Sequence, residues 1–338
     1  MLTACLNICR LAFFVCAVLF NPAVQAASLT VTSSADAGAG SLRQTILEAA
    51  ADDIIQFDEG MLITLTSGEL LIDKKLTIDG VGHAVTVSGN NASRVFHVRA
   101  ATVVLQNLTV TEGHADVGGG LLLEYSSGSP AATLTNVTFA DNSASSNGGG
   151  LHNDYGSTAT LTHVTFSGNS ASYGGGLYST EQATLTNVTF SGNTASYGGG
   201  LLNLADIVTL TYVTFSGNTA TSGGGIYSYS HIFLTNTLLA GNTGGNCSGP
   251  GEIHDFSKNL DDETSCNFGT YNGSLSNTVP LLGALGNYGG PTQTMALQTG
   301  SPAINAATGS IATTDQRGYF LNGTADLGAF EFGGVAPE

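Results

Sequence analysis

The sequence is poor in basic residues. Its 338 residues include 8 Lys and Arg against 25 Asp and Glu, which gives a formal net charge of −17. No Lys or Arg occurs between Arg99 and Lys258, across the whole middle of the chain. Proteins that bind DNA, RNA or anionic membranes do so with clustered cations. The composition therefore excludes nucleic acid as a partner and argues against binding to an anionic membrane surface.

Long apolar runs are also missing. The apolar stretch at residues 11–20 is shorter than the roughly 20 residues that a helix needs to cross a bilayer. It follows the single positive charge of Arg10 and precedes the sequence VQA. This order is typical of a secretory signal peptide, so residues 1–26 are predicted to be cleaved after Ala26. No membrane span is expected after cleavage, and the protein is expected to be extracellular or on the surface of a bacterium.

Cysteine is scarce. The sequence has 5, of which Cys5, Cys9 and Cys16 fall within the predicted signal peptide. The remaining pair, Cys247 and Cys266, encloses a short loop containing Gly and Asp, which in an exported protein indicates one disulfide worth about 3 kcal/mol. Free thiols or part of a metal site are the alternatives, but no neighbouring His or Cys completes a ligand set.

Glycine is abundant and occurs in a repeated phrase. The stretch "LTNVTFSGNTASYGGGL" begins at Leu185, a near copy begins at Leu161, and looser copies begin at Leu134 and Leu210. Self-similarity at this period is typical of a solenoid, in which each repeat buries its apolar face only by stacking on its neighbours. The glycine triplets begin at Gly118, Gly148, Gly174, Gly198 and Gly223, and the phenylalanines recur at Phe139, Phe166, Phe190 and Phe215.

Apolar and polar residues alternate with a period of two inside each repeat. Because Thr and Val are frequent and long helix formers are rare, this pattern favours strands over helical repeats. The alternation changes phase at Asn187, a residue type that tolerates the left-handed conformation of a corner. Three short strands in about 25 residues predict one coil of a right-handed parallel β-helix. The equivalent corners are Asn107, Asn136, His163, Tyr212 and Asn236.

Stacking of coils is expected to place like residues in columns. The phenylalanines predict one interior column, and the Asn residue of each SGN bend is expected to bond to its counterparts in adjacent coils. The triplets suit places where the backbone turns tightly or approaches another chain segment. A second interior column is expected from Leu121, Leu151, Leu177, Leu201 and Ile226.

The chain is predicted to contain three parts after the signal peptide. Residues 27–60 hold an N-terminal strand and a capping helix in "GSLRQTILEAA", with Ser41 as N-cap and Gln44 as its capping-box partner. Residues 61–245 form the coils, and 246–338 form the disulfide loop and C-terminal closing coils, with strands in "AINAATG" and "ADLGAFEF". The buried face of the helix is expected to comprise Leu42, Ile46, Leu47 and Ala50.

These motifs carry a resemblance to known families. The start "LTVTSSADAGAGSLRQTILEAAADDIIQF", together with the GGG and FSGN coils, resembles secreted bacterial right-handed β-helix proteins with a pectate-lyase-like fold. The coils are similar to the repeats of chlamydial polymorphic outer membrane proteins, and the ending "TDQRGYFLNGTADLGAFEF" resembles choice-of-anchor Q proteins. The resemblance implies a secreted or cell-surface protein of adhesive type and carries no established active site.

A polysaccharide-degrading enzyme, either a lyase or a glycoside hydrolase, is the alternative function. A lyase needs an Arg or Lys base beside acidic calcium ligands, and the central coils have no Arg or Lys. A glycoside hydrolase needs converging carboxylates. The adjacent acidic pairs, Asp52-Asp53 and Asp261-Asp262, are expected in solvated turns instead. The sequence therefore predicts no catalytic residue and no cofactor.

A metal site is the remaining chemical hypothesis. His152, Asp154 and His163 lie within a single coil length, but their spacing matches no known ligand pattern, and His163 occupies a corner position. No metal site is therefore predicted.

A binding surface is better supported by the residues that follow each triplet. Exposed aromatic side chains there suit sugar rings, because they offer a flat apolar face and a hydroxyl. We therefore expect a non-catalytic protein that binds glycan or a cell-surface partner. The alternative is that some of these side chains simply cover the sheet face. Rows of outward Thr, such as Thr184 and Thr186, resemble ice-binding β-helices, although Thr is common on exposed strands. The predicted ligand-binding face comprises His152, Tyr155, Tyr178, Tyr227 and Tyr229.

Overall fold

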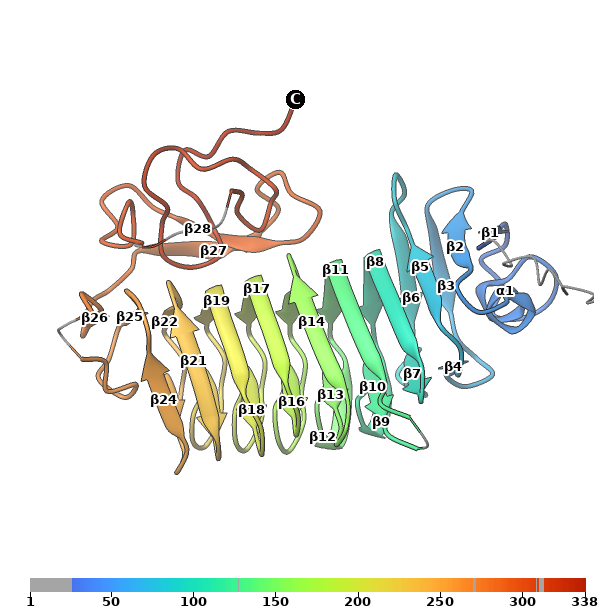
Figure 1. Ribbon diagram of the computed structural model, residues 1–338, viewed down its shortest axis with the longest axis horizontal. Helices are drawn as coiled ribbons and strands as arrows, with labels where there is room; N and C mark the ends of the chain where they lie inside the picture. Colours follow the sequence, from blue (N-terminus) through green and yellow to red (C-terminus); the bar gives the residue numbers. More distant parts are fainter. Residues whose placement is uncertain (1–25, 127, 270–271, 308, 310–312) are drawn as a thin grey trace, which may run out of the picture.

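The strands stack side by side along one axis and build an elongated solenoid (Figure 1). Among the described residues, all strand pairs of the solenoid are parallel, which confirms the predicted all-β parallel β-helix. The predicted signal peptide lies outside the described residues, apart from Ala26. The computed structural model describes residues 26–126, 128–269, 272–307, 309 and 313–338.

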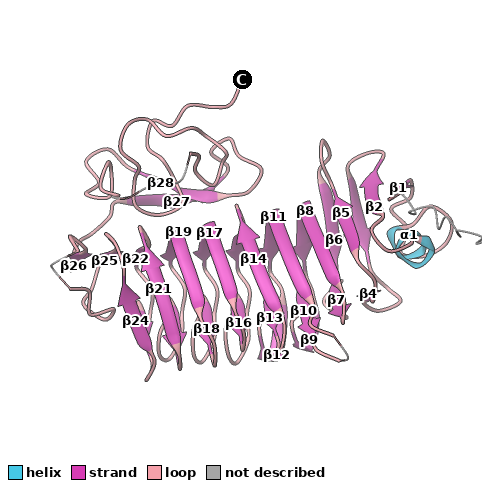
Figure 2. Ribbon diagram, viewed as in Figure 1, coloured by secondary structure: helices cyan, strands magenta, loops and turns pink. Residues whose placement is uncertain are grey.

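Two sheets form the walls of the solenoid, as the strands in Figure 2 show. The main path of the 16-stranded sheet comprises β1 (Ser28–Val31), β2 (Ile54–Phe57), β5 (Leu76–Asp79), β8 (Thr102–Thr111), β11 (Ala131–Ala140), β14 (Thr158–Thr162), β17 (Ala183–Ser191), β19 (Val208–Ser216), β22 (Leu238–Ala240), β25 (Leu260–Asp261) and β26 (Leu275–Ser276). Its other members are β3 (Met61–Thr64), β6 (Val85–Ser88), β15 (Thr165–Ser167), β21 (His231–Thr235) and β24 (Glu252–Asp255).

The second wall is an 8-stranded sheet that includes the strands following the glycine triplets. A two-stranded sheet of β9 (His114–Val117) and β12 (Ser143–Asn147) lies in the turns before two of the triplets. The order in the 8-stranded sheet is β23 (Cys247–Ser248), β20 (Ile226–Ser228), β18 (Leu201–Asn203), β16 (Leu177–Ser179), β13 (Leu151–Asn153), β10 (Leu121–Glu124), β7 (Phe96–Arg99) and β4 (Leu70–Ile72).

The predicted corners are confirmed by the backbone. Asn187 has a φ of +54°, and it bends β17 so that the segments before and after it belong to different sides of the coil. His163 and Tyr212 adopt the same conformation although their side chains are larger, with φ values of +57° and +54°. The register across the corner therefore fixes the backbone there, whichever residue type occupies it. The remaining predicted corners, Asn107, Asn136 and Asn236, also have positive φ.

The predicted interior columns are also confirmed. The rings of Phe139, Phe166, Phe190 and Phe215 stack with centroids 4.6 to 5.0 Å apart and are almost parallel. All four side chains are fully buried. The leucines after the triplets pair in register from one coil to the next, as Leu177 does with Leu201, and they are equally buried.

The glycine triplets allow the backbone of one coil to approach the next. Gly198 has a φ of +65°, which favours glycine. A Cβ on Gly199 would lie 2.6 Å from the carbonyl oxygen of Gly224, and one on Gly200 would lie 2.8 Å from the ring of Phe215. The third glycine of the triplet therefore makes room for the phenylalanine column.

A ladder of buried Asn side chains follows the SGN bends. The Nδ2 of Asn193 donates to the carbonyl oxygen of Phe166 at 2.9 Å and to Oδ1 of Asn218 at 2.8 Å. Its Oδ1 accepts from the backbone N and the Nδ2 of Asn169, at 3.0 and 2.9 Å. The predicted bonding between counterparts in adjacent coils is confirmed, and the ladder satisfies polar groups that would otherwise be buried without partners.

The helix α1 (Leu42–Glu48) lies at the N-terminal end of the solenoid (Figure 1). The Oγ of Ser41 accepts from the backbone N of Gln44, as an N-cap does. The predicted reciprocal cap is wrong, because the Gln44 side chain donates to Glu48 instead. The predicted buried face is also partly wrong: Leu47 is 65% exposed and Ala50 is exposed, whereas Thr45 and Ala49 are buried. No helix in the described ranges has the length and apolarity to cross a bilayer.

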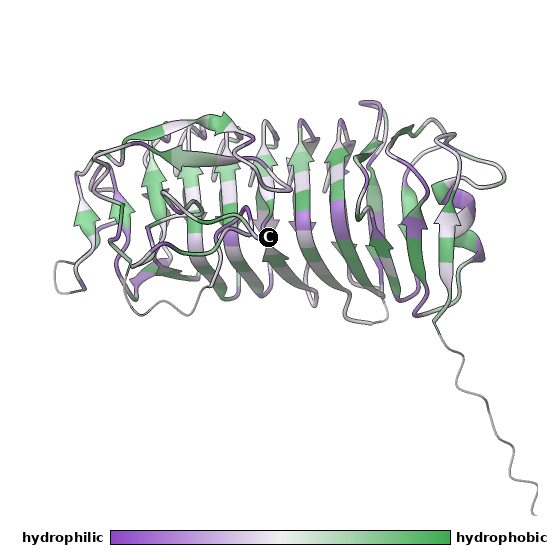
Figure 3. Ribbon diagram, turned by 90° about the horizontal axis from the view of Figure 1, so that it is seen from above, coloured by the Kyte–Doolittle hydropathy of each residue, from purple (hydrophilic) through white to green (hydrophobic). Residues whose placement is uncertain are grey.

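The chain leaves the solenoid after β26 and returns along it as a C-terminal cover, defined here as the described residues of 282–338. Figures 1 and 3 show this cover lying over the C-terminal half of the solenoid, with an antiparallel pair formed by β27 (Leu282–Gly286) and β28 (Thr294–Leu297). The closing strands expected in "AINAATG" and "ADLGAFEF" are absent from the described residues of these segments. Their Ala, Leu and Phe side chains pack instead on Tyr212, Leu238 and Leu260 of the solenoid.

Gln316 anchors the cover to the solenoid. It is fully buried, its Nε2 donates to Oγ1 of Thr165 at 2.8 Å, and its Oε1 accepts from Oγ1 of Thr189 at 2.6 Å. The neighbouring Arg317 is held between the rings of Tyr319 and Phe330, with its guanidinium carbon 4.1 and 3.8 Å from the ring centroids. The segment from Thr314 therefore contributes to the contact between the cover and the solenoid.

The predicted disulfide between Cys247 and Cys266 is confirmed, with Cα atoms 4.8 Å apart. Both residues are buried at the C-terminal end of the core. The bond links β23 to the loop after β25, where the repeat has ended.

Replacing Asn193 is expected to be much more destabilising than replacing its exposed neighbour. Asn193→Ala leaves the buried backbone N of Asn169 without its side-chain acceptor and removes the bond to Nδ2 of the same residue. It also removes the bonds that Nδ2 of Asn193 donates to the Phe166 carbonyl and to Asn218, so we expect a loss of about 2–5 kcal/mol in unfolding free energy. Thr194→Ala, at an exposed position on the same coil, is expected to change it by less than about 0.5 kcal/mol. Urea unfolding followed by circular dichroism measures both, and equal effects would contradict the role of the ladder.

Candidate functional site

The outward side chains of the 8-stranded sheet form one column along the solenoid. The parallel register places Tyr178 over His152 and under Leu202, and Tyr227 follows Leu202. Leu122 precedes His152 in the same column. Three predicted site residues, His152, Tyr178 and Tyr227, are thus brought into one row by strands β13, β16 and β20.

The exposure predicted for two of these residues is wrong. His152 is 6% exposed and Tyr178 is 8% exposed, whereas Tyr227 is partly exposed. The His152 and Tyr178 rings pack edge to face, with centroids 4.9 Å apart, so each covers the other. Strand alternation predicts that a side chain points outward, but it does not show how deeply the adjoining turns bury it. These two residues therefore form the floor of the face rather than its accessible surface.

The other two predicted residues are exposed. Tyr155 is 68% exposed and Tyr229 is 46% exposed, and both lie in loops that directly follow strands of the 8-stranded sheet. Tyr155 packs edge to face against Tyr125 from the preceding coil, at 6.1 Å between centroids. Tyr229 packs against Tyr227 at 5.2 Å. The loops therefore supply accessible aromatic rings along one side of the column.

Two further tyrosines, Tyr173 and Tyr197, were not predicted as site residues. Each precedes a glycine triplet in the phrase SYGGG, and their rings stack with centroids 5.6 Å apart and an interplanar angle of 9°. Tyr197 also contacts Tyr227 at 5.1 Å. Both belong to the repeated phrase, and this repetition places their rings at equivalent positions in adjacent coils. We call the whole set the tyrosine face: Tyr125, Tyr155, Tyr173, Tyr178, Tyr197, Tyr227 and Tyr229.

The hydroxyls of Tyr178 and Tyr227 are held in their neutral form. Burial raises the pKa of Tyr178, and the negative charge of Asp154 raises it further. Burial and a hydrogen bond with Tyr229 raise the pKa of Tyr227. A neutral phenol both donates and accepts hydrogen bonds. The face therefore combines apolar rings with uncharged polar groups.

A charged cluster continues the same column toward the N-terminus. His97 lies beside Leu122 in the register, and its ring nitrogens are 2.8 Å from Oε1 of Glu69 and 2.8 Å from Oε2 of Glu124. Arg94 forms an ion pair with Glu69. The hydrogen bond with His97 lowers the pKa of Glu69, and the charge of Arg94 contributes. A general acid for glycoside hydrolysis needs a raised pKa, so this pairing supports a structural role for Glu69.

The adjacent acidic pairs are also structural. Asp53 is buried and accepts from the backbone N of Ala27 and of Ala50, each at 2.8 Å. Asp261 is fully buried and accepts from Asn246 and from the backbone N of Cys266. The prediction of solvated turns is therefore wrong for Asp53 and Asp261. Their carboxylates satisfy buried backbone donors where the coil pattern is irregular.

The three residues considered for a metal site are not brought together. His152 and Asp154 lie 3.8 Å apart, whereas His163 is at a corner on another side of the coil, where its Nε2 is 3.3 Å from Nδ2 of Asn187. A different cluster, which the sequence did not indicate, lies on β21 and β24 and comprises His231, Glu252 and His254.

The repeats match a known family. Residues 136–154, 163–180, 187–203 and 212–229 match the Chlamydia polymorphic membrane protein repeat. Each matched segment begins at a corner residue of positive φ and includes the following triplet. The chain is therefore a β-helix protein like the polymorphic membrane proteins, as the resemblance implied.

Two solved structures are similar to the chain at low sequence identity. Jun a 1, the major allergen from cedar pollen, is 14% identical with a TM-score of 0.43, over 73% of this chain and 85% of that chain. The pectate lyase Pel9A is 14% identical with a TM-score of 0.46, over 90% of this chain and 96% of that chain. No curated protein sequence matches the chain.

The unfolding free energy is expected to change with pH because of His152. Neither ring nitrogen has a hydrogen-bond partner among the described residues, and burial lowers the pKa of His152 to about 4. An unfolded His has a pKa of about 6.5, so the unfolded state binds the proton more tightly and stability falls as the pH drops from about 6.5 to 4. This contribution amounts to about 3 kcal/mol.

His152→Leu introduces the residue type found at Leu122 and Leu202 of the same column. This variant is expected to lose less unfolding free energy at low pH than the wild type, because it lacks the imidazole of His152. Urea unfolding at pH 7 and pH 4.5 measures it against the wild type. His114→Gln, at an exposed position, is the control and is expected to retain the wild-type dependence. An equal loss of unfolding free energy between pH 7 and pH 4.5 in His152→Leu and the wild type would contradict this role of His152.

Proposed function

We propose that this protein is a non-catalytic surface protein that binds glycan through the tyrosine face. The observation that carries the proposal is the alignment of tyrosines on successive coils, with Tyr173 stacked on Tyr197 and Tyr197 in contact with Tyr227. Aromatic rings of this kind pack against the flat faces of sugar rings, and their hydroxyls bond to the sugar hydroxyls. A row extending over several coils suits an extended chain of sugar units.

The charge of the protein favours a neutral glycan. The formal net charge is −17, and no Lys or Arg occurs between Arg99 and Lys258, so the residues of the face offer no Lys or Arg to an acidic sugar. Asp154 lies close to Tyr178 and adds negative charge there. Repulsion of like charges therefore selects against polysaccharides rich in carboxylate or sulfate.

The membrane-protein repeats support placement at a cell surface. The matched segments contain the turns and strands that carry most of the tyrosine face, including Tyr173, Tyr178 and Tyr227. The sequence pattern at residues 1–26 favours export, although it lies almost entirely outside the described residues. An exported protein of this type would present the face to the surroundings of the bacterium.

The double variant Tyr173→Ala/Tyr229→Ala tests the proposal. Both side chains are exposed, so the fold should be retained while two stacking surfaces are lost. We expect the full-length wild type to bind neutral oligosaccharides on a glycan array and the variant to bind them at least about tenfold more weakly. Adhesion of beads coated with each protein to whole cells provides a second measurement.

Phe320→Ala is the matched control, because Phe320 is an exposed aromatic residue on the C-terminal cover. It is expected to bind as the wild type does. Equal binding by the double variant and the wild type, or a wild type that binds no glycan, would overturn the proposal.

A further inference from the structure

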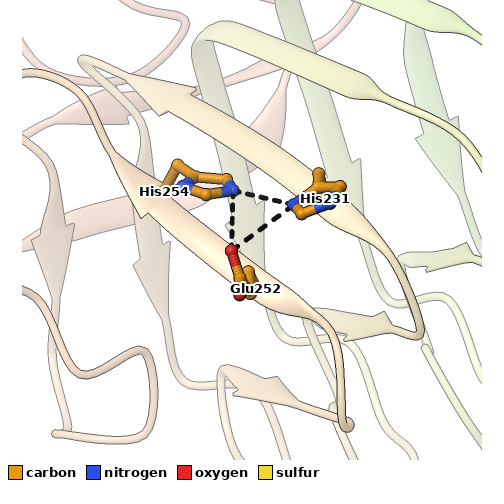
Figure 4. A group of neighbouring side chains, drawn as sticks. All are labelled: His231, Glu252 and His254. Atoms are coloured by element: carbon orange, nitrogen blue, oxygen red, sulfur yellow. Dashed lines mark hydrogen bonds and ion pairs between the residues drawn. The ribbon is translucent and has the colours of Figure 1, made fainter.

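A cluster of potential metal ligands lies on the last coils of the 16-stranded sheet. His231 begins β21, and Glu252 and His254 lie on the neighbouring strand β24 (Figure 4). The parallel register pairs His231 with Glu252 and Phe233 with His254. Because side chains two residues apart point to the same face of a strand, all three potential ligands lie on the outward face. The cluster lies on the 16-stranded sheet, whereas the strand residues of the tyrosine face, Tyr178 and Tyr227, lie on the 8-stranded sheet.

The three ligand atoms converge on one point. Nδ1 of His231 is 2.9 Å from Nε2 of His254, and each of these nitrogens is 3.5 Å from Oε2 of Glu252. Tetrahedral zinc with bonds of about 2.0–2.2 Å places its ligand atoms about 3.3–3.5 Å apart. Two of the three separations already match this value. The third requires the two imidazoles to move apart by about 0.4 Å, which half-exposed side chains accommodate.

Packing holds the imidazoles in this arrangement. The ring of His254 stacks on Phe233 with centroids 4.5 Å apart and an angle of 17°. Phe256 packs against the same phenylalanine at 5.1 Å. The ring of His231 lies over that of His254 at 5.2 Å. Ring orientation is therefore fixed by aromatic contacts, which lowers the cost of ordering the ligands when a metal binds.

We propose that His231, Glu252 and His254 form a binding site for a zinc-like divalent transition metal. Two imidazoles and one carboxylate are ligands that zinc uses, whereas calcium and magnesium prefer oxygen ligands alone. Glu252 is 69% exposed, and a hollow of about 480 Å³ adjoins His254, so the remaining coordination positions are open to water or another oxygen ligand.

The metal would also connect two strands at the end of the solenoid. Among the described residues, β24 pairs only with β21, so its other edge has no strand partner. A metal bound by His231 on one strand and by Glu252 and His254 on the other links this edge strand to the coil before it. Because the ion binds the folded state, it should raise the unfolding temperature.

Zinc titration of the full-length protein without a polyhistidine tag tests the proposal. After removal of metals with a chelator, isothermal calorimetry with ZnCl₂ is expected to show one site per chain, with no matching signal for Ca²⁺ or Mg²⁺. Zinc should raise the wild-type unfolding temperature, and Co²⁺ should produce the visible absorption of a tetrahedral site. Glu252→Gln and His231→Gln are each expected to weaken zinc binding by at least about tenfold.

His114→Gln is the control, because it removes an exposed imidazole from a different part of the solenoid. It should bind zinc as the wild type does. Absence of zinc binding would show that the contact between His231 and His254 is only a hydrogen bond between imidazoles and would overturn the proposal. Unchanged binding in Glu252→Gln and His231→Gln would also overturn it.

Discussion

Hydrogen bonding between parallel strands of adjacent coils is the interaction on which the rest of the structure depends. It holds β17 against β19 from Ala183 paired with Val208 to Ser191 paired with Ser216. Each side chain therefore lies about 4.8 Å from its counterpart in the next coil. At this separation, interior positions accept phenylalanines that stack, asparagines that bond to one another and glycines that leave space. The repeated phrase in the sequence is the consequence of this spacing.

The interior could be predicted from the sequence because each residue there faces a copy of itself. The corners were found from the change of phase in the alternation, so His163 and Tyr212 were placed correctly although neither is Asn. Burial on the outside could not be predicted in the same way. His152 and Tyr178 point outward, as expected, but both are buried, and each ring covers the other within their column. Those contacts depend on the shape of the turns, which a period of two does not describe.

Features beyond the last clear repeat were also hidden in the sequence. His231 and His254 meet only because β24 pairs with β21 in a particular register, and no repeated phrase marks that register. The C-terminal cover depends on Gln316, which reaches residues more than a hundred positions earlier in the chain. Contacts between segments of unlike sequence leave no periodic signal. The metal ligands and the cover therefore appear only in the three-dimensional structure.

Stacking of the coils aligns outward side chains as well as interior ones. It can therefore produce a continuous surface of similar side chains. An outward tyrosine in one coil gains a neighbour when the next coil carries another, as Tyr173 does with Tyr197. Leu202 interrupts the outward column between Tyr178 and Tyr227, yet the aromatic contact continues through Tyr197, which packs against Tyr227. Tyr197 lies in the turn before a glycine triplet, and Tyr227 lies on strand β20. The contact between them keeps the row of aromatic rings continuous where the outward column of the strands contains Leu202. A change in one coil can therefore alter the tyrosine face without disturbing the phenylalanine and asparagine columns beneath it.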